Sequence, residues 1–432
     1  MWGLINMNIV IYGEVALDWL ISQDEALSYR IGGAGLYAAL SSAKSGGNVE
    51  LLTIIGAEID DYYKSVWNGM GVSFKHAKND EEYNISNYLV TGFENYQKKT
   101  SIPVVSKKFN HEYSPTLPEE YDAILIFPIN HSIPKDMCIK AKSDNKMVFL
   151  DPKPNQESIA DAREVLEYVD VLLVNEEELS ILSDLSDTNE GIKKLLGYGI
   201  KYVIVKRGIK GCILAESDKE LSIIPAYRSN AVCTLGSGDV FGGALATIFI
   251  ETGNMEYSVK YASCMAASFI ESMDTEQMPS KRAVEKYLYK RESMRCSSLK
   301  NITIYLAGPF FSRQELYWVN LIHKRLEAIG LSVLSPSREN GIIGLNSSVN
   351  EKKDIFNMDL KLLKQSDVVI ALLDHNDSGT SFEIGYAYSN NIPIIGLKTS
   401  DDKLNNMIQV GCNAICNSIE ELIEEVYKYV SK

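Results

Sequence analysis

The sequence predicts an α/β protein with two domains, each built on a parallel sheet that is covered by helices. First, its 432 residues exceed the roughly 250–300 over which a single hydrophobic core stops growing. Second, short apolar runs rich in β-branched residues alternate with helical patterns, which is typical of doubly wound folds. Third, this alternation stops once, in the polar stretch 292–301, and then begins again.

The first part of the chain contains the runs that we expect to form the larger sheet. Buried strands are predicted at 8–12, 123–127, 147–150, 171–174 and 202–205. In a doubly wound sheet, ligands bind beyond the carboxyl ends of the strands, so residues that follow these runs are candidates for a site. The stretch from about Asn84 to Glu112 is more polar and alternates weakly, and we predict a β-rich lid there.

The domain boundary is predicted where the apolar periodicity fails. A helical pattern at 284–291 is the last of the first series, and an apolar run at 302–306 opens the second. We therefore predict a first domain over 1–292, a linker over 293–300 and a second domain over 301–432. Further strands of the second domain are expected at 332–334, 368–372 and 393–396.

Composition and charge exclude several classes of protein. The chain carries 43 basic and 57 acidic side chains, a formal net charge of −14 and a pI near 5.0, and such a surface repels a nucleic-acid backbone. No apolar run is long enough to span a bilayer, and residues 1–13 lack the features of a secretory signal. The seven cysteines are scattered along the chain, which favours a reducing cytoplasm over a disulfide framework.

The most informative local feature of the first domain is the segment 233–246, a glycine-rich turn that runs directly into an apolar helix. Glycines let backbone N–H groups converge at a helix N-terminus, where the helix dipole favours a phosphate group. Asp239 lies at the mouth of this turn, where a carboxylate can accept a proton from an attacking hydroxyl group. Taken alone, the segment is equally compatible with a simple loop capped by an acidic residue.

Other motifs of the first domain occur in a definite order. They are Asp18, Gly32-Gly-Ala-Gly35, Ile55-Gly-Ala-Glu-Ile-Asp60, Asp151-Pro-Lys-Pro154, Asn175-Glu-Glu-Glu178, Lys206-Arg-Gly-Ile-Lys-Gly211 and Gly236-Ser-Gly-Asp239. This series resembles the ribokinase-like, or PfkB, family of sugar and nucleoside kinases over nearly all of residues 7–290. The resemblance implies a ribokinase-like fold with a β lid and an ATP-dependent phosphotransferase activity.

Carried over by position, the resemblance implies a role for the phosphate-binding motifs. Asp239 matches the catalytic base of the family. Its neighbours match the anion hole that stabilises charge on the transferred phosphoryl group: Gly236, Ser237 and Gly238. Asn175 and Glu178 match the motif that positions Mg²⁺, indirectly, together with the nucleotide phosphates, and oxygen ligands suit that ion. Read alone, Asn175 and Asp18 are equally compatible with capping or turn positions.

The acceptor side of the site is implied by four further residues. Asp18 matches the acid that grips sugar hydroxyls, and Gly32 and Gly33 match the hinge that closes the lid. Ribokinases have Asn where this chain has Tyr37; an aromatic ring there can stack on a base, which favours a nucleoside acceptor, but it also suits a core position. Many relatives have Asp-Thr where this chain has Cys233-Thr234, so the chain departs from the monovalent-cation site that some of them build there.

The strongest signal of the second domain is the segment 374–387, which follows a predicted buried strand and places carboxylates at its carboxyl end. Together with Tyr305-Leu-Ala-Gly-Pro-Phe-Phe311 and the acidic residues Asp359 and Asp367, it resembles the nucleoside 2-deoxyribosyltransferases and their nucleotide N-hydrolase relatives over roughly residues 301–415. The resemblance implies a smaller flavodoxin-like or Rossmann-like α/β domain. By residue type alone, an acid-rich loop is more often solvated surface.

The same resemblance implies how the second domain acts on an N-glycosidic bond. Glu383 matches the nucleophile that attacks the anomeric carbon, and Tyr305 the residue that orients it. Asp359 matches the group that assists departure of the base, and Asp377 a sugar-binding residue. A carboxylate can capture or stabilise an oxocarbenium-like centre, and the leaving base needs a proton. Because a carboxylate at position 377 repels a 5′-phosphate, an unphosphorylated nucleoside is favoured.

The complete hypothesis is a cytoplasmic, bifunctional nucleoside-salvage enzyme that uses ATP, Mg²⁺ and, as in some relatives, a monovalent cation. Asn405 and Met407 resemble a segment that relatives lend to a neighbouring subunit's site, so we expect a homo-oligomer. Sequence leaves open whether the second domain is a hydrolase or a transferase and which reaction comes first. The alternatives are a kinase whose second domain only senses nucleosides, and a binding protein in which neither site turns over.

Overall fold

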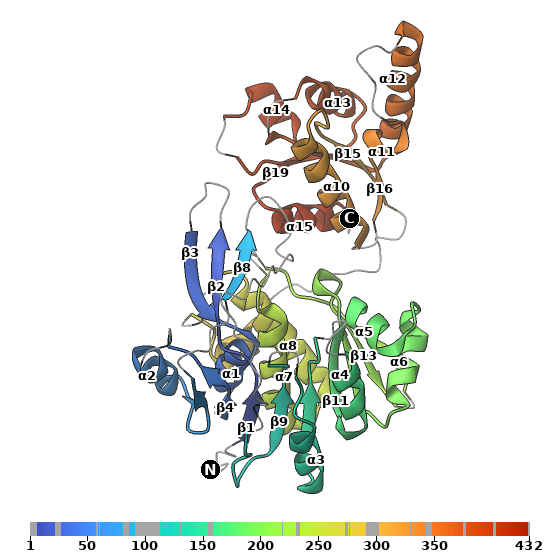
Figure 1. Cartoon of the computed structure of the whole chain (residues 1–432). Helices are drawn as coiled ribbons and strands as arrows, with labels where there is room; N and C mark the ends of the chain where they lie inside the picture. The colour runs from blue at the N-terminus through green and yellow to red at the C-terminus, as the bar shows by residue number, and fades with distance from the viewer. Residues whose placement is uncertain are drawn as a thin grey trace. The chain divides into compact units, whose positions relative to one another are not determined.

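The computed structural model describes residues 7–21, 27–57, 59, 61–80, 86–90, 113, 115–129, 132–153, 159–217, 219–229, 234–272, 275, 277–290, 302–328, 331–341, 348–374, 377–400 and 403–430. The chain divides into two compact units, one of Met1–Leu89 with Tyr96–Met294 and the other of Val90–Asn95 with Arg295–Lys432 (Figure 1). The predicted linker at 293–300 lies outside the described residues, as do residues 84–85 and 91–112 of the predicted lid.

The first unit is built on a nine-stranded sheet with the order β14-β13-β12-β11-β10-β9-β1-β4-β6. Its strands are β1 (Met7–Tyr12), β4 (Gly47–Leu52), β6 (Val72–Ser73), β9 (Ala123–Ile126), β10 (Met147–Leu150), β11 (Val171–Asn175), β12 (Tyr202–Lys206), β13 (Cys212–Glu216) and β14 (Ser222–Ile224). In the order of the sheet, the strands from β12 through β1 to β6 are parallel. At the β12 edge, β13 and β14 add two antiparallel strands. The five strands predicted from the apolar runs are confirmed as β1, β9, β10, β11 and β12.

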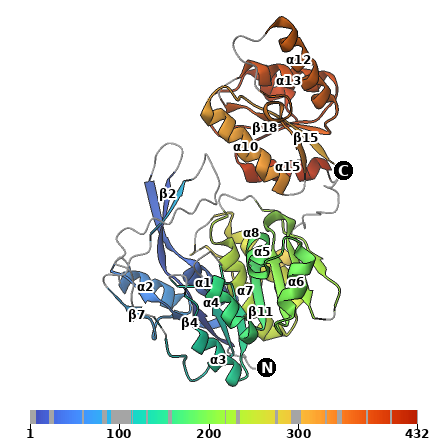
Figure 2. The same cartoon turned by 45° about the vertical axis from the view of Figure 1, so that its right-hand side comes forward.

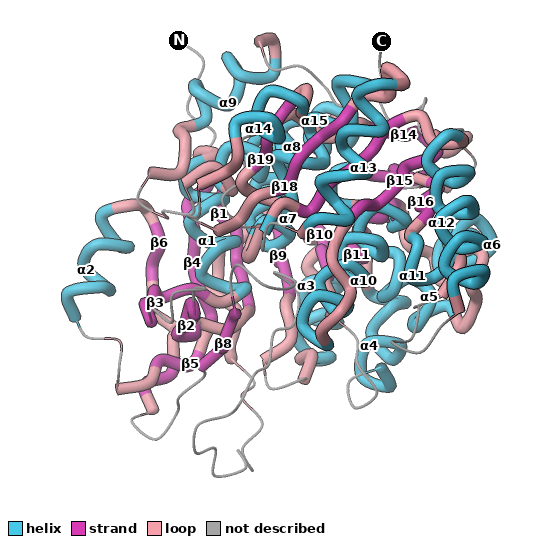
Figure 3. The backbone as a smooth tube through the Cα atoms, turned by 90° about the horizontal axis from the view of Figure 1, so that it is seen from above, coloured by secondary structure: helices cyan, strands magenta, loops and turns pink. Residues whose placement is uncertain are grey.

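Helices flank this sheet on both faces (Figure 3). One face packs on α1 (Ala34–Lys44), α7 (Ser237–Thr252), α8 (Met255–Phe269) and α9 (Lys281–Leu288). The other packs on α3 (Lys135–Ser143), α4 (Ile159–Val165), α5 (Glu176–Ser183) and α6 (Thr188–Leu196), with short 3₁₀ turns at Leu166–Tyr168 and Gly208–Lys210. Within β1, Ile9 and Ile11 join the first core and Val10 and Tyr12 the second, because successive side chains of a strand point to opposite faces. Burial on both faces explains why the strands read as continuous apolar runs.

A small antiparallel sheet, here called the lid sheet, is formed by β2 (Ala16–Ile21), β3 (Leu27–Gly32) and β8 (Ser86–Val90) in the order β3-β2-β8. In its β2–β3 hairpin, Asp18 lies opposite Arg30. Two short strands, β5 (Ile54–Ile55) and β7 (Lys78–Asn79), pair in parallel. In the sequence, α2 (Asp61–Gly69) lies between them. The lid predicted from Asn84 onward thus includes β8, whereas the apolar periodicity does not reveal the β2–β3 hairpin.

The second unit contains a five-stranded, all-parallel sheet with the order β16-β15-β17-β18-β19 (Figure 2). Counted within the unit, this is the order 2-1-3-4-5 of flavodoxin-like folds. The strands are β15 (Thr303–Ala307), β16 (Ser332–Leu334), β17 (Val368–Leu372), β18 (Ile394–Leu397) and β19 (Ala414–Cys416). The helices are α10 (Arg313–Ala328), α11 (Pro336–Glu339), α12 (Val349–Lys364), α13 (Ser378–Ser389), α14 (Asn406–Gly411) and α15 (Ile419–Val430). Among the helices described in either unit, none has both the length and the apolar character needed to cross a bilayer.

Candidate active sites

Polar side chains gather where the central strands of the nine-stranded sheet end. Asp151 directly follows β10, Asn175 is the last residue of β11, and Lys206 is the last residue of β12. Since these strands are parallel neighbours, their carboxyl ends lie at one edge of the sheet. Asp239, in the first turn of α7, reaches the same edge through a contact with Lys153. The fold therefore brings together motifs that lie far apart in the sequence.

The N-terminus of α7 has the backbone geometry expected of a phosphate cradle. Gly236 is its N-cap with φ 77°, a left-handed conformation that favours glycine. As a glycine, this N-cap has no side chain that could occupy the backbone N–H groups of the first turn. Ser237 and Gly238 form the beginning of the helix, where the helix dipole and the backbone N–H groups suit an anion. This geometry is compatible with the anion hole predicted at Gly236, Ser237 and Gly238, which stays a prediction.

Two lysines neutralise carboxylates at this edge of the sheet. Lys153 Nζ lies 2.6 Å from Asp239 Oδ1, and Lys206 Nζ is paired with Oδ2 of the fully buried Asp151. Burial disfavours the charged form of each lysine, but the combined attraction of the surrounding carboxylates, with Asp239 foremost for Lys153 and Asp151 for Lys206, outweighs it and raises both lysine pKa values. Both lysines are therefore charged at neutral pH.

Asn175 and Glu178 form a reciprocal capping box at the start of α5. The Glu178 N–H donates to Asn175 Oδ1 at 2.8 Å, and the Asn175 N–H donates to Glu178 Oε2 at 2.7 Å. The box therefore occupies the Asn175 side-chain oxygen but leaves one Glu178 oxygen outside it. Burial, followed by the charge of Asp151, raises the pKa of Glu178. A partly buried carboxylate with a spare oxygen fits the water shell of a nucleotide-bound Mg²⁺.

Tyr37 connects the lid sheet to the N-terminus of α7. Its hydroxyl donates to Asp18 Oδ2 at 2.7 Å, and a Cβ atom at Gly236 would come within 2.7 Å of its ring. Gly32 borders both polar groups, since a Cβ atom there would lie 2.2 Å from Asp18 Oδ2 and 2.3 Å from the Tyr37 hydroxyl, and Gly33 is the N-cap of α1. The Tyr37 ring is 1% exposed. A ring enclosed in this way has no open face, so the expectation that it stacks on a base does not agree with the structure.

In the second unit, Tyr305 and Glu383 form a hydrogen-bonded pair across β15 and α13. The hydroxyl of the fully buried Tyr305 donates to Glu383 Oε1 at 2.5 Å. Burial raises the pKa of Glu383 to about 8; the Tyr305 hydrogen bond acts in the opposite direction, and the charges of Asp359 and Asp377 act in the same direction. Burial and the Glu383 charge likewise raise the pKa of Tyr305. The four residues selected by the resemblance thus interact electrostatically at one place.

Asp359 lies on α12 and has a partner that the sequence does not single out. Asn340, just after α11, donates from Nδ2 to Asp359 Oδ1 at 2.7 Å. Burial raises the pKa of Asp359, and the hydrogen bond from Asn340 lowers it. A carboxyl group with a raised pKa holds its proton to a higher pH. This property suits the predicted role of assisting the departing base.

Two of the predicted substrate-binding residues are helix N-caps in this structure. Asp377 Oδ2 accepts hydrogen bonds from the Thr380 N–H at 2.6 Å and the Thr380 hydroxyl at 2.9 Å at the start of α13. Asn405 Oδ1 accepts from the Met407 N–H at 2.8 Å at the start of α14. These contacts orient both side chains. Binding of a substrate by Asp377 or Asn405 stays a prediction.

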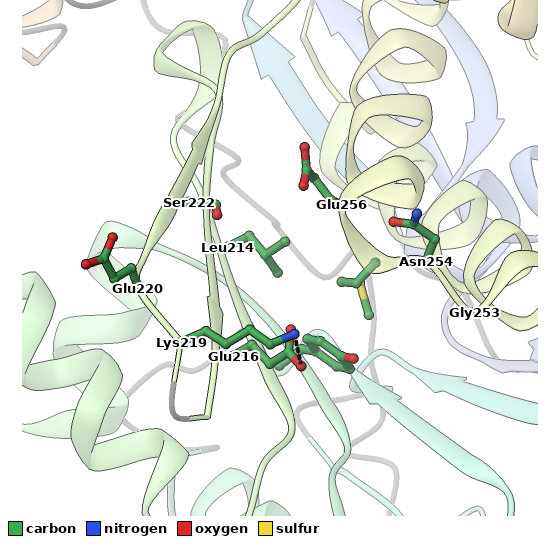
Figure 4. Close-up of a pocket in the computed structure, with 10 residues that line it drawn as sticks. Leu214, Glu216, Lys219, Glu220, Ser222, Gly253, Asn254 and Glu256 are labelled. Carbon is green, nitrogen blue, oxygen red and sulfur yellow. Dashed lines mark ion pairs between the residues drawn. The ribbon is translucent and has the colours of Figure 1, made fainter.

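A cavity of about 330 Å³ in the first unit lies away from these residues. It is lined by the strands β12 to β14 and by the turn between α7 and α8, including Leu214, Asn254 and Glu256 (Figure 4). Tyr202, the first residue of β12, borders the cavity, whereas the last residue of that strand, Lys206, is at the candidate site. The cavity therefore lies at the amino end of β12, whereas the candidate site lies at its carboxyl end.

Sequence reasoning assigns no role to Lys153, Lys206 or Asn340, although the structure pairs each with a carboxylate of a candidate site. Lys206 directly follows a predicted strand and Lys153 stands three residues after another, and a position beyond the carboxyl end of a strand is a signal that points to both. Asn340 stands in a polar segment without a motif, so the sequence offers no comparable signal for it.

Two family models match the chain. Residues 2–282, well over half of the chain, match the model of the pfkB family carbohydrate kinases. Residues 304–422 match the model of nucleoside 2-deoxyribosyltransferase. The two matches fall on the two α/β folds described above.

Individual relatives agree with the first match. A cytidine kinase from Thermococcus kodakarensis is 26% identical over 255 residues, which are 55% of this chain and 86% of the relative. A ribokinase from Bacillus subtilis is 24% identical over 307 residues, 65% of this chain and 99% of the relative. The solved structure of a Burkholderia thailandensis nucleoside kinase with inosine is similar in fold, with a TM-score of 0.53, 16% identity and coverage of 65% of this chain and 98% of that one. The chain therefore belongs to the pfkB family of carbohydrate kinases, and its second unit matches the nucleoside 2-deoxyribosyltransferase family.

Proposed function

We propose that this chain is a bifunctional nucleoside-salvage enzyme. Its first unit would phosphorylate a hydroxyl of a sugar or nucleoside with ATP, and its second would cleave or transfer at the N-glycosidic bond of a (deoxy)nucleoside. The observation that carries the proposal is that each unit has a candidate reactive carboxylate bound by a second side chain. Asp239 is bound by Lys153, and Glu383 is bound by Tyr305.

In the first unit, Asp239 acts as the general base. It accepts the proton of the acceptor hydroxyl while that oxygen bonds to the γ-phosphorus and the bond to the leaving oxygen of ADP breaks. The backbone N–H groups at the start of α7 stabilise the charge on the transferred group. When bound, Mg²⁺ would neutralise charge on the nucleotide phosphates, and Glu178 is the residue that would hold its water shell. Cys233, where some relatives build a monovalent-cation site, lies outside the described residues.

The acceptor is a nucleoside or a pentose. A cytidine kinase and a ribokinase are both similar to this chain over most of their length, which supports either acceptor. Asp18, held by the Tyr37 hydroxyl, is the proposed hydroxyl-binding acid. Because the Tyr37 ring is enclosed, a nucleoside base would have to be recognised by other residues.

In the second unit, the Glu383 carboxylate attacks or stabilises the anomeric carbon. The bond from that carbon to the base nitrogen breaks, its electron pair goes to the base, and Asp359 supplies a proton. With a pKa of about 8, roughly one Glu383 in ten is ionised at pH 7 before substrate binds. Positive charge that develops on the sugar favours the ionised form. Water then completes a hydrolase reaction, and a second base completes a transferase reaction.

We also propose that the protein forms a homo-oligomer in the cytoplasm. Met407 and Val410 on α14 are 78% and 71% exposed, and Tyr388 on α13 is 65% exposed. These two helices pack against each other. Large apolar side chains gathered on neighbouring elements mark an interaction surface. The residues that relatives lend to a neighbouring subunit match Asn405 and Met407 in this same region.

The proposal is tested by incubating the purified protein with nucleosides, 5′-nucleotides, ribose and 2-deoxyribose, with and without Mg-ATP, and identifying the products by mass spectrometry. Asp239→Asn should lower phosphorylation by about 10²–10⁴-fold, since it removes the general base, and leave base release unchanged. Glu383→Gln should abolish base release and leave phosphorylation unchanged. Asp187→Asn and Glu351→Gln, carboxylates at the helix N-termini of α6 and α12, are matched controls.

The outcomes distinguish the alternatives. Phosphorylation without base release from any substrate would mean that the second unit acts as a nucleoside-sensing module. Base release that requires ATP would mean that phosphorylation comes first and that Asp377 does not exclude a phosphate. Binding of nucleosides by calorimetry without any turnover would refute both catalytic roles.

A further inference from the structure

The ion pair between Lys153 and Asp239 has no part in the phosphate binding proposed for the start of α7. Lys153 follows β10, Asp239 lies in α7, and the two charged groups approach within 2.6 Å at Nζ and Oδ1. The Asp239 side chain is 13% exposed and that of Lys153 is 36% exposed. The carboxylate is therefore largely enclosed, and the lysine covers it at the edge where the strands end.

The backbone of Lys153 has a conformation that is unfavourable for residues other than Gly, Asn and Asp. Its φ is 39°, in the left-handed region. Elsewhere in the described part of the chain, the non-glycine residues with positive φ are Asn145, Asp184 and Asn391, which are of the types that tolerate this region. Such a conformation persists only where the surrounding structure determines it, and it occurs preferentially at active sites. The unfavourable backbone directs this lysine toward Asp239.

A second contact fixes the ammonium group of Lys153. Nζ lies 5.3 Å from the centre of the ring of Phe127, a fully buried residue that follows β9. A cation over an aromatic face is attracted by it, so the ammonium is held between that ring and the Asp239 carboxylate. The neighbouring Lys206 is bound to Asp151. Of these two lysines, Lys153 is therefore the one that pairs with Asp239.

We propose that Lys153 is a positioning residue for phosphoryl transfer, which holds Asp239 by one oxygen and so directs the other to the acceptor hydroxyl. This inference rests on the proposed function, in which Asp239 is the base. As the acceptor oxygen bonds to the γ-phosphorus and the bond to the ADP oxygen breaks, the hydroxyl proton passes to Asp239. Neutral Asp239 no longer balances the positive charge of Lys153, which then stabilises the negative charge of the nearby transferred group.

The kinetic test uses the full chain with Mg-ATP and follows the formation of ADP with cytidine, inosine, ribose and 2-deoxyribose as acceptors. With the acceptor that reacts fastest, Lys153→Met should lower kcat by about 100-fold, because positioning of the base contributes to the chemical step. The KM for ATP should change by less than about threefold, because the interaction acts in the transition state. Lys153→Arg keeps the positive charge and should retain at least about a tenth of the native kcat.

Two further measurements separate positioning from a structural role. Added methylammonium should restore turnover to Lys153→Ala in a saturable manner, because a small cation can take the place of the missing ammonium group. Lys142→Met is the matched control. Lys142 is also 36% exposed and pairs at 2.8 Å with Asp170, which is 2% exposed, away from the candidate site. Its replacement should leave kcat unchanged even where it lowers the melting temperature.

The results that would overturn the inference differ from those that would overturn the proposed function. A kcat of Lys153→Met within about threefold of native, or a loss that neither arginine nor methylammonium restores, removes the positioning role alone, provided that Asp239→Asn is inactive. Native turnover by Asp239→Asn removes the proposed base and the inference with it. The same holds if no acceptor supports ADP formation.

Discussion

Glu383 carries a proton that its chemistry requires it to lose. Its pKa of about 8 lies well above the usual value for Glu, so only a minority of the free enzyme is ionised at neutral pH. With a nucleoside whose base departs without being protonated, so that Asp359 is not needed, we expect kcat/KM for base release to rise about tenfold per pH unit below pH 8 and to level off above it, because the ionised Glu383 carboxylate attacks. A pH–rate profile measures this. A flat profile between pH 6 and 9 would contradict the assignment of Glu383 as the nucleophile.

Replacement of Tyr305 by Phe tests the hydrogen bond that opposes this shift. The Tyr305 hydroxyl favours the ionised form and lowers the pKa of Glu383. Its loss in Tyr305→Phe therefore moves the rise in the pH–rate profile to higher pH and slows base release at pH 7. Tyr289→Phe, in the first unit and 89% exposed, is the control and should leave the profile where it is.

At the residue scale, the sequence identifies side chains whose chemistry and neighbours in the chain are both distinctive. Asp239 and Glu383 lie within motifs that resemble those of the two families, and this resemblance selects them, although their catalytic roles stay predictions. The Lys153–Asp239 contact is not found, because it depends on a left-handed backbone conformation that no local pattern reveals. The enclosed ring of Tyr37 is likewise a product of packing between α1, the lid sheet and α7.

At the scale of elements, α7 depends on a close approach to α1. A Cβ atom at Gly243 would lie 2.0 Å from the Ala38 carbonyl oxygen, whereas one at Gly242 would meet side chains at 3.4 Å. Gly243→Ala should therefore lower the free energy of unfolding by about 3 kcal/mol or displace α7, with loss of kinase activity. Gly242→Ala should stay within about 1 kcal/mol of native, since it also gains helix propensity. Urea unfolding compares the adjacent variants, and equal stability would contradict the close approach.

The periodicity predicts β1 and β9 to β12 of the first sheet and β15 to β18 of the second, because burial on both faces leaves a continuous apolar run, but it does not predict the parallel strands β4, β6 and β19. It does not predict β13 and β14, or the β2–β3 hairpin, because short strands at an edge or in a small sheet need only a few apolar residues. Their antiparallel pairing joins strands that follow one another in the chain through short connections. The polar stretch 84–112 indicates a lid, and β8 is the strand of it that the structure describes.

At the scale of the whole molecule, each unit has its own sheet and its own hydrophobic core. Scanning calorimetry of the full chain should therefore show two transitions. Mg-ATP at 100 times its Kd should stabilise only the kinase unit, by about 2.7 kcal/mol, and so raise the melting temperature of one transition by several degrees. A nucleoside that cannot be phosphorylated should raise the other. A single transition that both ligands shift would contradict independent units.

Tyr37 has a consequence for how this kinase can acquire new acceptors. Its hydroxyl is committed to Asp18 and its ring supports Gly236, so one side chain serves both acceptor recognition and phosphate binding. A lineage that exchanged the acid at position 18 would also alter the support beneath the phosphate cradle. The residues at positions 18, 37 and 236 should therefore co-vary among descendants of this gene, and changes of acceptor preference should arise first at positions outside this trio.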